Sequence, residues 1–229
     1  MQLIKVKICG IRTTEAALHA TEEGADFVGM IFVPNRRRSI AISDAKNIVE
    51  RLQHVSKHRT LTVGLFANQP ISAIIEISER VGLDMVQLCG DEPLEYCDQI
   101  PIPLIKSVHV PKQAVDAEFV EGLAIKLEQF SKAGHIIALD TLVDGLEGGT
   151  GSSFNWDIAN HLSKDGYEFM LSGGLDPDNL ATAIEKIRPW GVDVSSGVET
   201  EGEKDEAKIS AFIAICRQLP ATSGWEGGT

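Results

Sequence analysis

Short apolar runs alternate along the chain with longer segments in which apolar residues recur at helical spacing. The short runs are rich in β-branched residues and predict strands at residues 4–9, 26–33, 60–66, 84–88, 103–108, 135–140, 167–172 and 192–195. The longer segments predict helices at residues 15–23, 43–53, 71–81, 94–99, 112–131, 156–162, 178–187 and 204–219. Strands and helices that take turns in this way indicate a parallel sheet covered by helices.

The joints between the predicted helices and strands repeat. Gly24, Gly82 and Gly191 each begin a Gly-x-Asp sequence, and each is predicted to take the left-handed conformation that ends a helix. Gly24 and Gly82 lie two strand–helix units apart, which makes one unit about 29 residues long. Eight such units predict an α/β fold, a single-domain (β/α)8 TIM barrel over residues 1–220, followed by a flexible C-terminal tail at 221–229. An open doubly wound sheet is the alternative, although it rarely needs eight such regular units.

The charge of the chain narrows its possible partners. With 33 acidic and 21 basic residues, the formal net charge is −12, so we expect no binding of nucleic acid or of an anionic membrane through the overall field. The start of the chain does not resemble a secretory signal, and no apolar run reaches the roughly 20 residues that span a bilayer. Four scattered cysteines without a C-x-x-C pair argue against structural zinc and indicate a reduced, cytoplasmic setting.

In such a barrel the loops that follow the strands all lie on one face, and this face carries the chemistry. Cys9 ends the first predicted strand and Asp140 ends the sixth. Partial burial would raise the pKa of Asp140 and make it a proton donor, whereas Cys9 would be a general base if its thiolate were favoured. An inert, packed thiol is the alternative for Cys9. Cys89 lies at the same rim, but a disulfide or metal pair with Cys9 is less favoured because no histidine is expected in the neighbouring loops.

Glycines concentrate in the loops after the last three predicted strands, "TLVDGLEGGTGSS", "SGGLDP" and "SSGVE". Glycine lets backbone N–H groups approach an anion, and this pattern predicts a phosphate site. The alternative is that these glycines only form tight turns. Asp176 or Asp178 is predicted to cap the helix that follows "SGGLDP".

Three further features of the rim are candidates for ligand contacts. The loop after the second strand contains three consecutive arginines, residues 36–38, which either form a solvated loop or bind a carboxylate or phosphate. Gln87 is a weaker candidate for a hydrogen bond at the barrel mouth. Asp193 is a further candidate: the alternative is that it is only the aspartate of its Gly-x-Asp joint, although it lies nearer a strand end than the other two.

Eight motifs occur in a characteristic order from about residue 5 to residue 216: "VKICGI", "GADFVGMIF", "VGLF", "VQLCG", "ALDT", "GGTGSSFNW", "LSGGLDPDNL" and "VDVSSGVE". In this order they resemble the phosphoribosylanthranilate isomerase family. The resemblance implies an Amadori rearrangement of N-(5-phosphoribosyl)anthranilate to 1-(o-carboxyphenylamino)-1-deoxyribulose 5-phosphate in tryptophan biosynthesis. It implies no metal or cofactor, and its partner is a phosphorylated small molecule. The assembly is expected to be a monomer or a homodimer.

The resemblance also implies roles for individual residues. Cys9 of "KICG" matches the general base and Asp140 of "LDT" matches the general acid, while Arg38 would hold the anthranilate carboxylate. Gln87 remains a candidate for a second substrate contact. The residues assigned to the phosphate are Gly149, Gly151, Gly173, Gly174, Asp193, Ser195, Ser196 and Gly197.

Two positions depart from the family pattern. The second loop usually reads Pro-x-Ser-x-Arg, and here Arg36 replaces the serine. The fourth strand usually ends Val-Gln-Leu-His-Gly, and here Cys89 replaces the histidine. Both positions lie near the expected substrate, so the contacts to its carboxylate or to its aromatic ring are expected to differ.

Two other functions are alternatives for such a barrel: a different phosphate-binding enzyme, or a binding protein without catalysis. Related phosphate-binding barrels include indole-glycerol-phosphate synthase, which should offer catalytic lysines at strand ends, and the histidine-pathway isomerase, which should have an aspartate where Cys9 stands. Neither pattern is present. The other alternative is a phosphosugar-binding barrel without catalysis, against which the intact acid–base pair argues.

Overall fold

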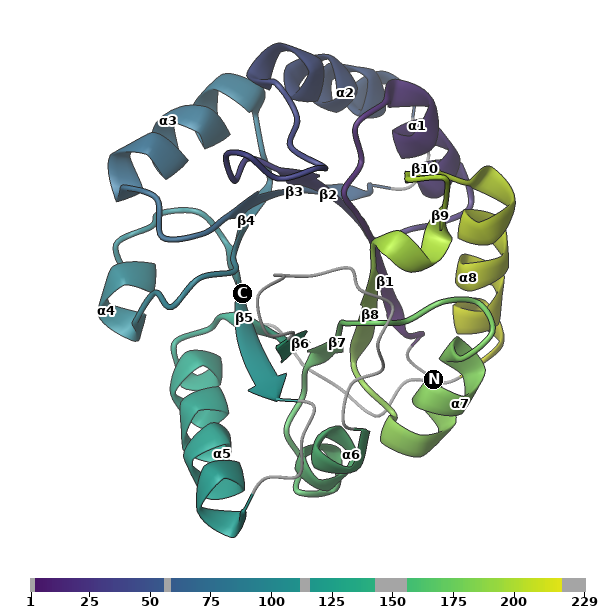
Figure 1. Cartoon of the computed structure of the whole chain (residues 1–229). Helices are drawn as coiled ribbons and strands as arrows, with labels where there is room; N and C mark the ends of the chain where they lie inside the picture. Colours follow the sequence, from purple (N-terminus) through teal and green to yellow (C-terminus); the bar gives the residue numbers. More distant parts are fainter. Residues whose placement is uncertain (1–2, 56–58, 112–115, 143–155, 220–229) are drawn as a thin grey trace.

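The computed structural model describes residues 3–55, 59–111, 116–142 and 156–219. Within these ranges parallel strands close into one barrel in chain order, with β8 pairing against β1. Figure 1 looks along the barrel axis and shows the strands as an inner ring with the helices outside it. The barrel strands are β1 (Lys5–Cys9), β2 (Phe27–Ile31), β3 (Leu61–Phe66), β4 (Met85–Leu88), β5 (Leu104–Pro111), β6 (Ile136–Leu142), β7 (Met170–Leu171) and β8 (Gly191–Val194).

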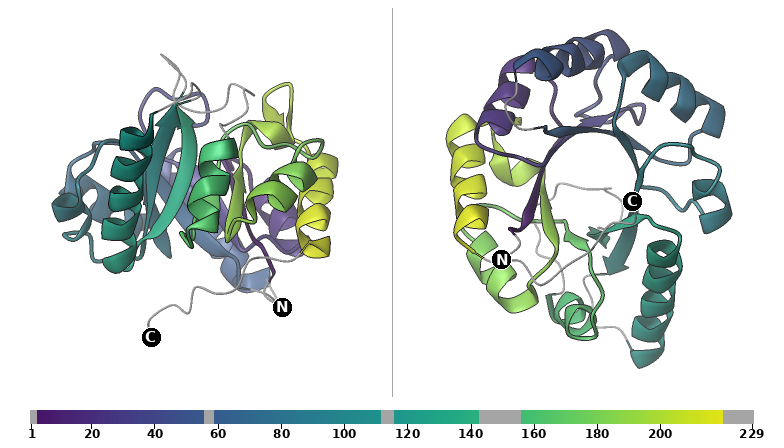
Figure 2. Two further views of the ribbon diagram at one scale, coloured as in Figure 1. Left: turned by 90° about the horizontal axis from the view of Figure 1, so that it is seen from below. Right: turned by 180° about the vertical axis from the view of Figure 1, so that it is seen from behind.

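One helix follows each strand, and in the side view of Figure 2 the helices run alongside the strands, so that the connecting loops gather at the two ends. The predicted (β/α)8 barrel is therefore confirmed, and the open sheet is wrong. None of the helices in the described ranges combines the length and hydropathy that crossing a membrane requires. The helices are α1 (Thr14–Glu22), α2 (Ile42–Val55), α3 (Ile71–Val81), α4 (Leu94–Cys97), α5 (Ala117–Lys132), α6 (Trp156–Lys164), α7 (Leu180–Ile187) and α8 (Glu206–Gln218).

The alternation of side chains along each strand separates two packed layers. One set of positions faces the helices and forms the larger apolar core. The other set faces the barrel interior, where the lower part is filled by apolar residues such as Phe27, Val63 and Met170. Towards the carboxyl ends the inward positions become polar, and these polar residues surround a cavity. The predicted C-terminal tail, residues 221–229, lies outside the described residues.

Several elements differ in extent from the sequence prediction, and two of these differences affect the carboxyl end of the barrel. The strand β5 continues to Pro111 instead of ending at residue 108, which adds one more inward position, that of His109. A short 3-10 helix η1 (Ser196–Val198) and a hairpin of β9 (Glu199–Thr200) and β10 (Glu203–Lys204) precede α8. The hairpin turn contains two residues with positive φ, which matches a tight two-residue turn, and the dipeptide Glu-Gly is a weak sequence signal for it.

The Gly-x-Asp sequence occurs in two different structural contexts. Gly24 (φ 96°) and Gly82 (φ 80°) are left-handed at helix ends, as predicted. The prediction is wrong for Gly191, which is the first residue of β8 and pairs with Lys5. Arg188 (φ 53°) is the left-handed residue that ends α7. Gly191 is instead required by close packing, since a Cβ there would lie 3.0 Å from the carbonyl oxygen of Lys5.

A buried ion pair ties three neighbouring segments together on the outer side of the barrel rim. Lys106 of β5 is fully buried, and its Nζ donates to Oε2 of Glu92 at 2.6 Å and to the carbonyl of Gly90 at 2.6 Å. Oε1 of Glu92 also accepts a hydrogen bond from the backbone N–H of Asn68. Burial raises the pKa of Glu92, but the hydrogen bonds from Asn68 and Lys106 outweigh this and hold it below its ordinary value.

We predict that Lys106→Met destabilises the fold by about 3–5 kcal/mol, because it leaves the carboxylate of Glu92 buried without its partner. Lys106→Met combined with Glu92→Leu should cost less than the sum of the single changes, since neither charge then remains unpaired. Unfolding in urea measures both. The control is Lys132→Met, which breaks an exposed pair with Glu128 and should change stability far less. A similar cost for Lys106→Met and Lys132→Met would contradict the prediction.

Candidate active site

A cavity of about 490 Å³ opens at the carboxyl end of the barrel. Its walls come from strands around the ring and from the loops that follow β2, β7 and β8. A larger hollow, about 760 Å³, lies beside α7 and α8 and is lined by Gly174, Ser196 and Lys208 among others. We assign the chemistry to the smaller cavity because the titratable residues converge there. Its polar lining consists of Cys9, Asn35, Arg36, Arg37, Arg38, Gln87, Cys89, His109, Asp140, Ser172, Asp193, Ser195 and Ser196.

Cys9 ends β1 and is only 4% exposed, yet its side chain lines this cavity. Lys7, two residues earlier on the same inward face, is fully buried and its Nζ lies 2.9 Å from Oδ2 of Asp193. Burial raises the pKa of the Cys9 thiol, and the positive charges of Lys7 and Lys204 oppose this rise. The pKa of Lys7 is raised by Asp193 and Cys9 in spite of burial, so Lys7 stays a cation beside the sulfur. The thiol is therefore neutral at rest and has a fixed cation next to it.

Asp140 lies on β6, at an inward position that lines the same cavity as Cys9. Its strand is separated from β1 by β7 and β8. In the parallel register the neighbour of Asp140 on β5 is His109. The two predicted titratable groups, a thiol and a carboxyl group, thus line one space from different sides.

The loops after β7 and β8 have the backbone geometry of an anion site. Gly173 (φ 90°) and Gly174 (φ 68°) are both left-handed, a conformation that favours glycine. A Cβ at Gly197 would lie 1.9 Å from the carbonyl oxygen of Leu175, so the two loops approach each other too closely for any other residue. Ser195 and Ser196 line the cavity beside them. Gly149 and Gly151, also predicted here, lie outside the described residues.

The segment before α7 is held by side chain-to-backbone hydrogen bonds. Oδ1 of Asp176 accepts from the backbone N–H groups of Asp178 and Asn179. The side-chain nitrogen of Asn179 donates to the carbonyl of Gly174 at 2.8 Å. Of the two predicted caps, Asp176 is the one that binds backbone N–H groups here. These contacts fix the conformation of the glycine pair.

The geometry argues against the predicted phosphate contact of Asp193. Its Oδ2 accepts from Lys7 inside the barrel, and a carboxylate there would repel a phosphate group. Asp193 is therefore the ion-pair partner of Lys7, below Cys9.

Gln87 lines the cavity, as predicted. Its Nε2 donates to Ser107 Oγ at 2.9 Å, and its Oε1 is buried without a partner among the described residues.

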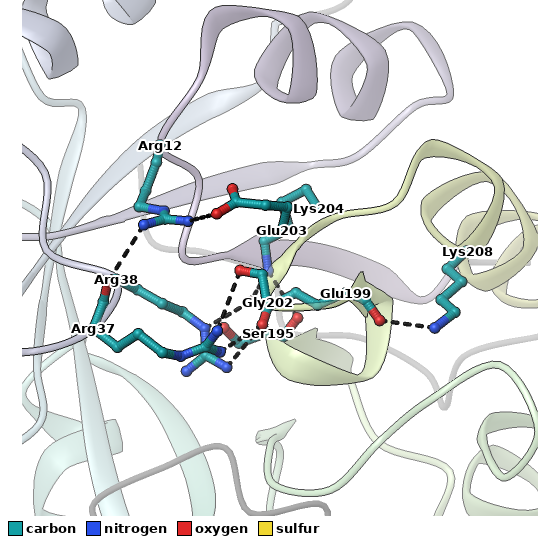
Figure 3. A network of polar contacts seen from close by, with 9 residues as sticks. All are labelled: Arg12, Arg37, Arg38, Ser195, Glu199, Gly202, Glu203, Lys204 and Lys208. Carbon is teal, nitrogen blue, oxygen red and sulfur yellow. Dashed lines mark hydrogen bonds and ion pairs between the residues drawn. The ribbon is translucent and has the colours of Figure 1, made fainter.

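Figure 3 shows how Arg37 and Arg38 of the second loop point towards the loop after β8. Nε and Nη2 of Arg38 donate to the two carboxylate oxygens of Glu199 at 2.6 and 3.1 Å. Arg37 and Lys204 bind the same carboxylate at 2.6 and 3.1 Å. The side chain of Arg38 is 12% exposed, whereas that of Arg37 is 54% exposed. The solvated-loop alternative thus fits Arg37 but not Arg38.

Three cations around one carboxylate leave an excess of positive charge at this rim. Burial raises the pKa of Glu199, but the hydrogen bond from Arg38 and the charge of Lys204 outweigh it and lower the pKa to about 2. Nζ of Lys204 also donates to the carbonyl of Ser195, next to the glycine loops. An acidic protein can therefore attract an anion here, because the local charge and not the net charge decides.

Sequence reasoning missed four residues of this site: Lys7, His109, Glu199 and Lys204. Lys7 could have been found, since it lies two positions before Cys9 and therefore on the same face of the strand. No histidine was expected in the loops near Cys89, but His109 on strand β5 approaches it, with Nε2 2.9 Å from the Cys89 carbonyl oxygen. All four cysteines are free. No group of three or more metal-ligating side chains occurs in the described ranges.

We predict that the stability cost of Glu199→Gln depends on pH. Because the folded pKa of Glu199 is about 2 and its ordinary value is 4.5, the charged carboxylate stabilises the fold above pH 4.5. This contribution is lost as the pH falls towards 2. The difference in Tm between the native chain and Glu199→Gln should therefore shrink between pH 4.5 and pH 2. Glu76→Gln, which alters an exposed pair with Arg80, is the control and should change Tm little at any pH. A pH-independent difference for Glu199→Gln would refute the prediction.

Relatives in sequence cover nearly the whole chain. The family model described as N-(5'phosphoribosyl)anthranilate (PRA) isomerase matches residues 6–214. The N-(5'-phosphoribosyl)anthranilate isomerase of Dehalococcoides mccartyi is 40% identical over 211 residues, which cover 92% of this chain and 94% of the relative. The enzyme of the same name from Roseiflexus castenholzii is 40% identical over 217 residues, covering 93% of this chain and 97% of the relative.

Solved structures agree with the sequence comparison. Phosphoribosyl anthranilate isomerase from Thermotoga maritima superimposes with a TM-score of 0.80 at 36% identity, covering 95% of this chain and 100% of that chain. A structure of the isomerase in complex with reduced 1-(o-carboxyphenylamino)-1-deoxyribulose 5-phosphate gives a TM-score of 0.77 at 35% identity, with the same coverage. Sequence, barrel and site geometry lead to one conclusion: the chain belongs to the N-(5'-phosphoribosyl)anthranilate isomerase family.

Proposed function

We propose that this chain converts N-(5-phosphoribosyl)anthranilate to 1-(o-carboxyphenylamino)-1-deoxyribulose 5-phosphate, with Cys9 as general base and Asp140 as general acid. The observation that carries the proposal is that both side chains line one cavity, although β7 and β8 separate their strands. An aldose–ketose rearrangement needs an acid and a base that reach the same sugar. The reaction is a step of tryptophan biosynthesis, as expected for this family.

The two anionic ends of the substrate fit two different parts of the rim. The phosphate would bind to backbone N–H groups and hydroxyls of the glycine loops, formed by Gly173, Gly174, Ser195, Ser196 and Gly197. The anthranilate carboxylate would bind to Arg38, whose guanidinium already binds one carboxylate, that of Glu199. With both ends held, the ribose lies across the cavity between Cys9 and Asp140.

The first chemical step is ring opening. The protonated carboxyl group of Asp140 donates its proton to the ring oxygen of the ribose, the bond between that oxygen and C1 breaks, and a Schiff base forms between C1 and the nitrogen. The position of Asp140 at an inward site of β6 lets it face the sugar.

The second step is proton abstraction. The thiol of Cys9 first releases its proton to solvent in the open cavity. The resulting thiolate removes the proton from C2, and the electron pair left on C2 forms the double bond of an enolamine, which then tautomerises to the ketone product. Since burial raises the pKa of Cys9, forming the thiolate requires help. The ammonium group of Lys7 provides it, because a cation beside the sulfur favours the charged form.

The four free cysteines fit the reducing cytoplasm in which we place this enzyme.

Removing either catalytic group should reduce turnover strongly. We predict that Cys9→Ser and Asp140→Asn each lower kcat by at least ~100-fold, the usual scale for a positioned acid or base. The assay follows the loss of anthranilate-type fluorescence from freshly prepared substrate. Thermal melting of each variant controls for folding. Near-normal turnover in either variant would end the assignment of that residue, and a folded native protein without turnover would favour a phosphosugar-binding barrel without catalysis.

Removing the guanidinium of Arg38 should affect binding more than chemistry. We predict that Arg38→Ala raises KM about 10-fold or more with a smaller change in kcat, since the carboxylate lies away from the reacting carbons. Arg37→Ala is the matched control, because Arg37 belongs to the same loop and binds the same Glu199 but is half exposed. If KM is unchanged in Arg38→Ala, the carboxylate contact belongs to Arg36 or Arg37.

A further inference from the structure

His109 lines the catalytic cavity but has no part in the acid–base mechanism above. It lies at an inward position near the end of β5, two residues after the inward Ser107. Its neighbour in the parallel register is Asp140. Adjacent strands lie about 4.8 Å apart, so the imidazole stands next to the carboxyl group proposed to open the sugar ring.

A backbone hydrogen bond fixes the chemical state of the two ring nitrogens. Nε2 of His109 lies 2.9 Å from the carbonyl oxygen of Cys89. A carbonyl oxygen can only accept, so Nε2 carries the hydrogen of this bond. In the neutral ring Nδ1 then has a free lone pair and acts as an acceptor.

Nδ1 of His109 is buried and has no hydrogen-bond partner in the described part of the chain. Oε1 of Gln87, on the neighbouring strand β4, is also buried without a hydrogen-bond partner among the described residues. Buried acceptors without a partner are uncommon in folded proteins, because they lose their water without replacing it. Two such acceptors on adjacent walls of one cavity indicate that a hydrogen-bond donor of the substrate completes them.

We propose that His109 is a substrate-binding residue whose Nδ1 accepts a hydrogen bond from the substrate, given by a sugar hydroxyl or by the anilino N–H. This contact holds the reacting part of the sugar beside Asp140. The inference rests on the proposed function, because the donor belongs to the substrate of that reaction.

Three substitutions separate this role from a structural one. His109→Gln places its amide near the Nε2 position and can keep the bond to the Cys89 carbonyl, but it offers no acceptor at the Nδ1 position. His109→Asn does the reverse, because its shorter side chain places an acceptor near Nδ1 and gives up the bond to Cys89. His109→Ala removes both groups. The measurements are steady-state kinetics, thermal melting, and calorimetric binding of reduced 1-(o-carboxyphenylamino)-1-deoxyribulose 5-phosphate and of ribose 5-phosphate.

We expect His109→Gln and His109→Ala to raise KM, and the Kd of the reduced analogue, about 10-fold, with His109→Asn within about threefold of the native enzyme. If the donor is a sugar hydroxyl, ribose 5-phosphate binding weakens as well. If the donor is the anilino N–H, only the reduced analogue binds more weakly. Native affinity in His109→Gln together with weakened His109→Asn would overturn the proposal, because the bond to Cys89 would then be all that matters. A native enzyme without turnover would instead refute the proposed function, and the native measurement is made first.

Discussion

The pairing of β1 with β8 is the constraint on which the site depends. It closes the barrel and sets Lys7 beside Asp193, residues at opposite ends of the chain, in the parallel register. Their ion pair is buried directly below Cys9. A lysine with no partner at that depth would lose its charge or unfold the barrel. With Asp193 beside it, Lys7 remains a cation next to the thiol of Cys9 and favours the thiolate that the proposed mechanism requires.

The distribution of charge around the cavity resolves an apparent conflict between an acidic protein and an anionic substrate. The net charge is −12, yet Glu199 gathers Arg37, Arg38 and Lys204 at one rim. The same carboxylate links the loop after β2 to the loop after β8. Electrostatics and loop conformation therefore depend on one buried group, which orients Arg38 before any substrate arrives.

Two walls of the cavity are formed in different ways, one by backbone conformation and the other by side chains. The glycine loops that we propose for the phosphate depend on backbone conformation: Gly173 and Gly174 are left-handed, and Gly197 has no room for a Cβ. The opposite wall depends on side chains, where His109 and Gln87 present buried acceptors. A left-handed or tightly packed backbone is compatible with few residue types. A side-chain group, in contrast, can reach the same wall of the cavity from a neighbouring strand. This difference explains how an imidazole can reach the cavity from β5, whereas the glycine loops have little freedom to change.

The sequence by itself determined the fold and the principal site residues. Apolar periodicity and the repeating unit predicted the barrel, and the place of Cys9 and Asp140 at strand ends put both at the functional face, because every strand of such a barrel ends on the same side. Only the tertiary structure decided the partners of these residues. The Lys7–Asp193 pair depends on barrel closure, the Arg38–Glu199 pair joins loops 161 residues apart, and His109 faces the cavity because β5 runs beyond its predicted end. The periodicity of one strand indicates which face each residue occupies. The register between two distant strands determines which residues pair, and it cannot be read from either strand alone.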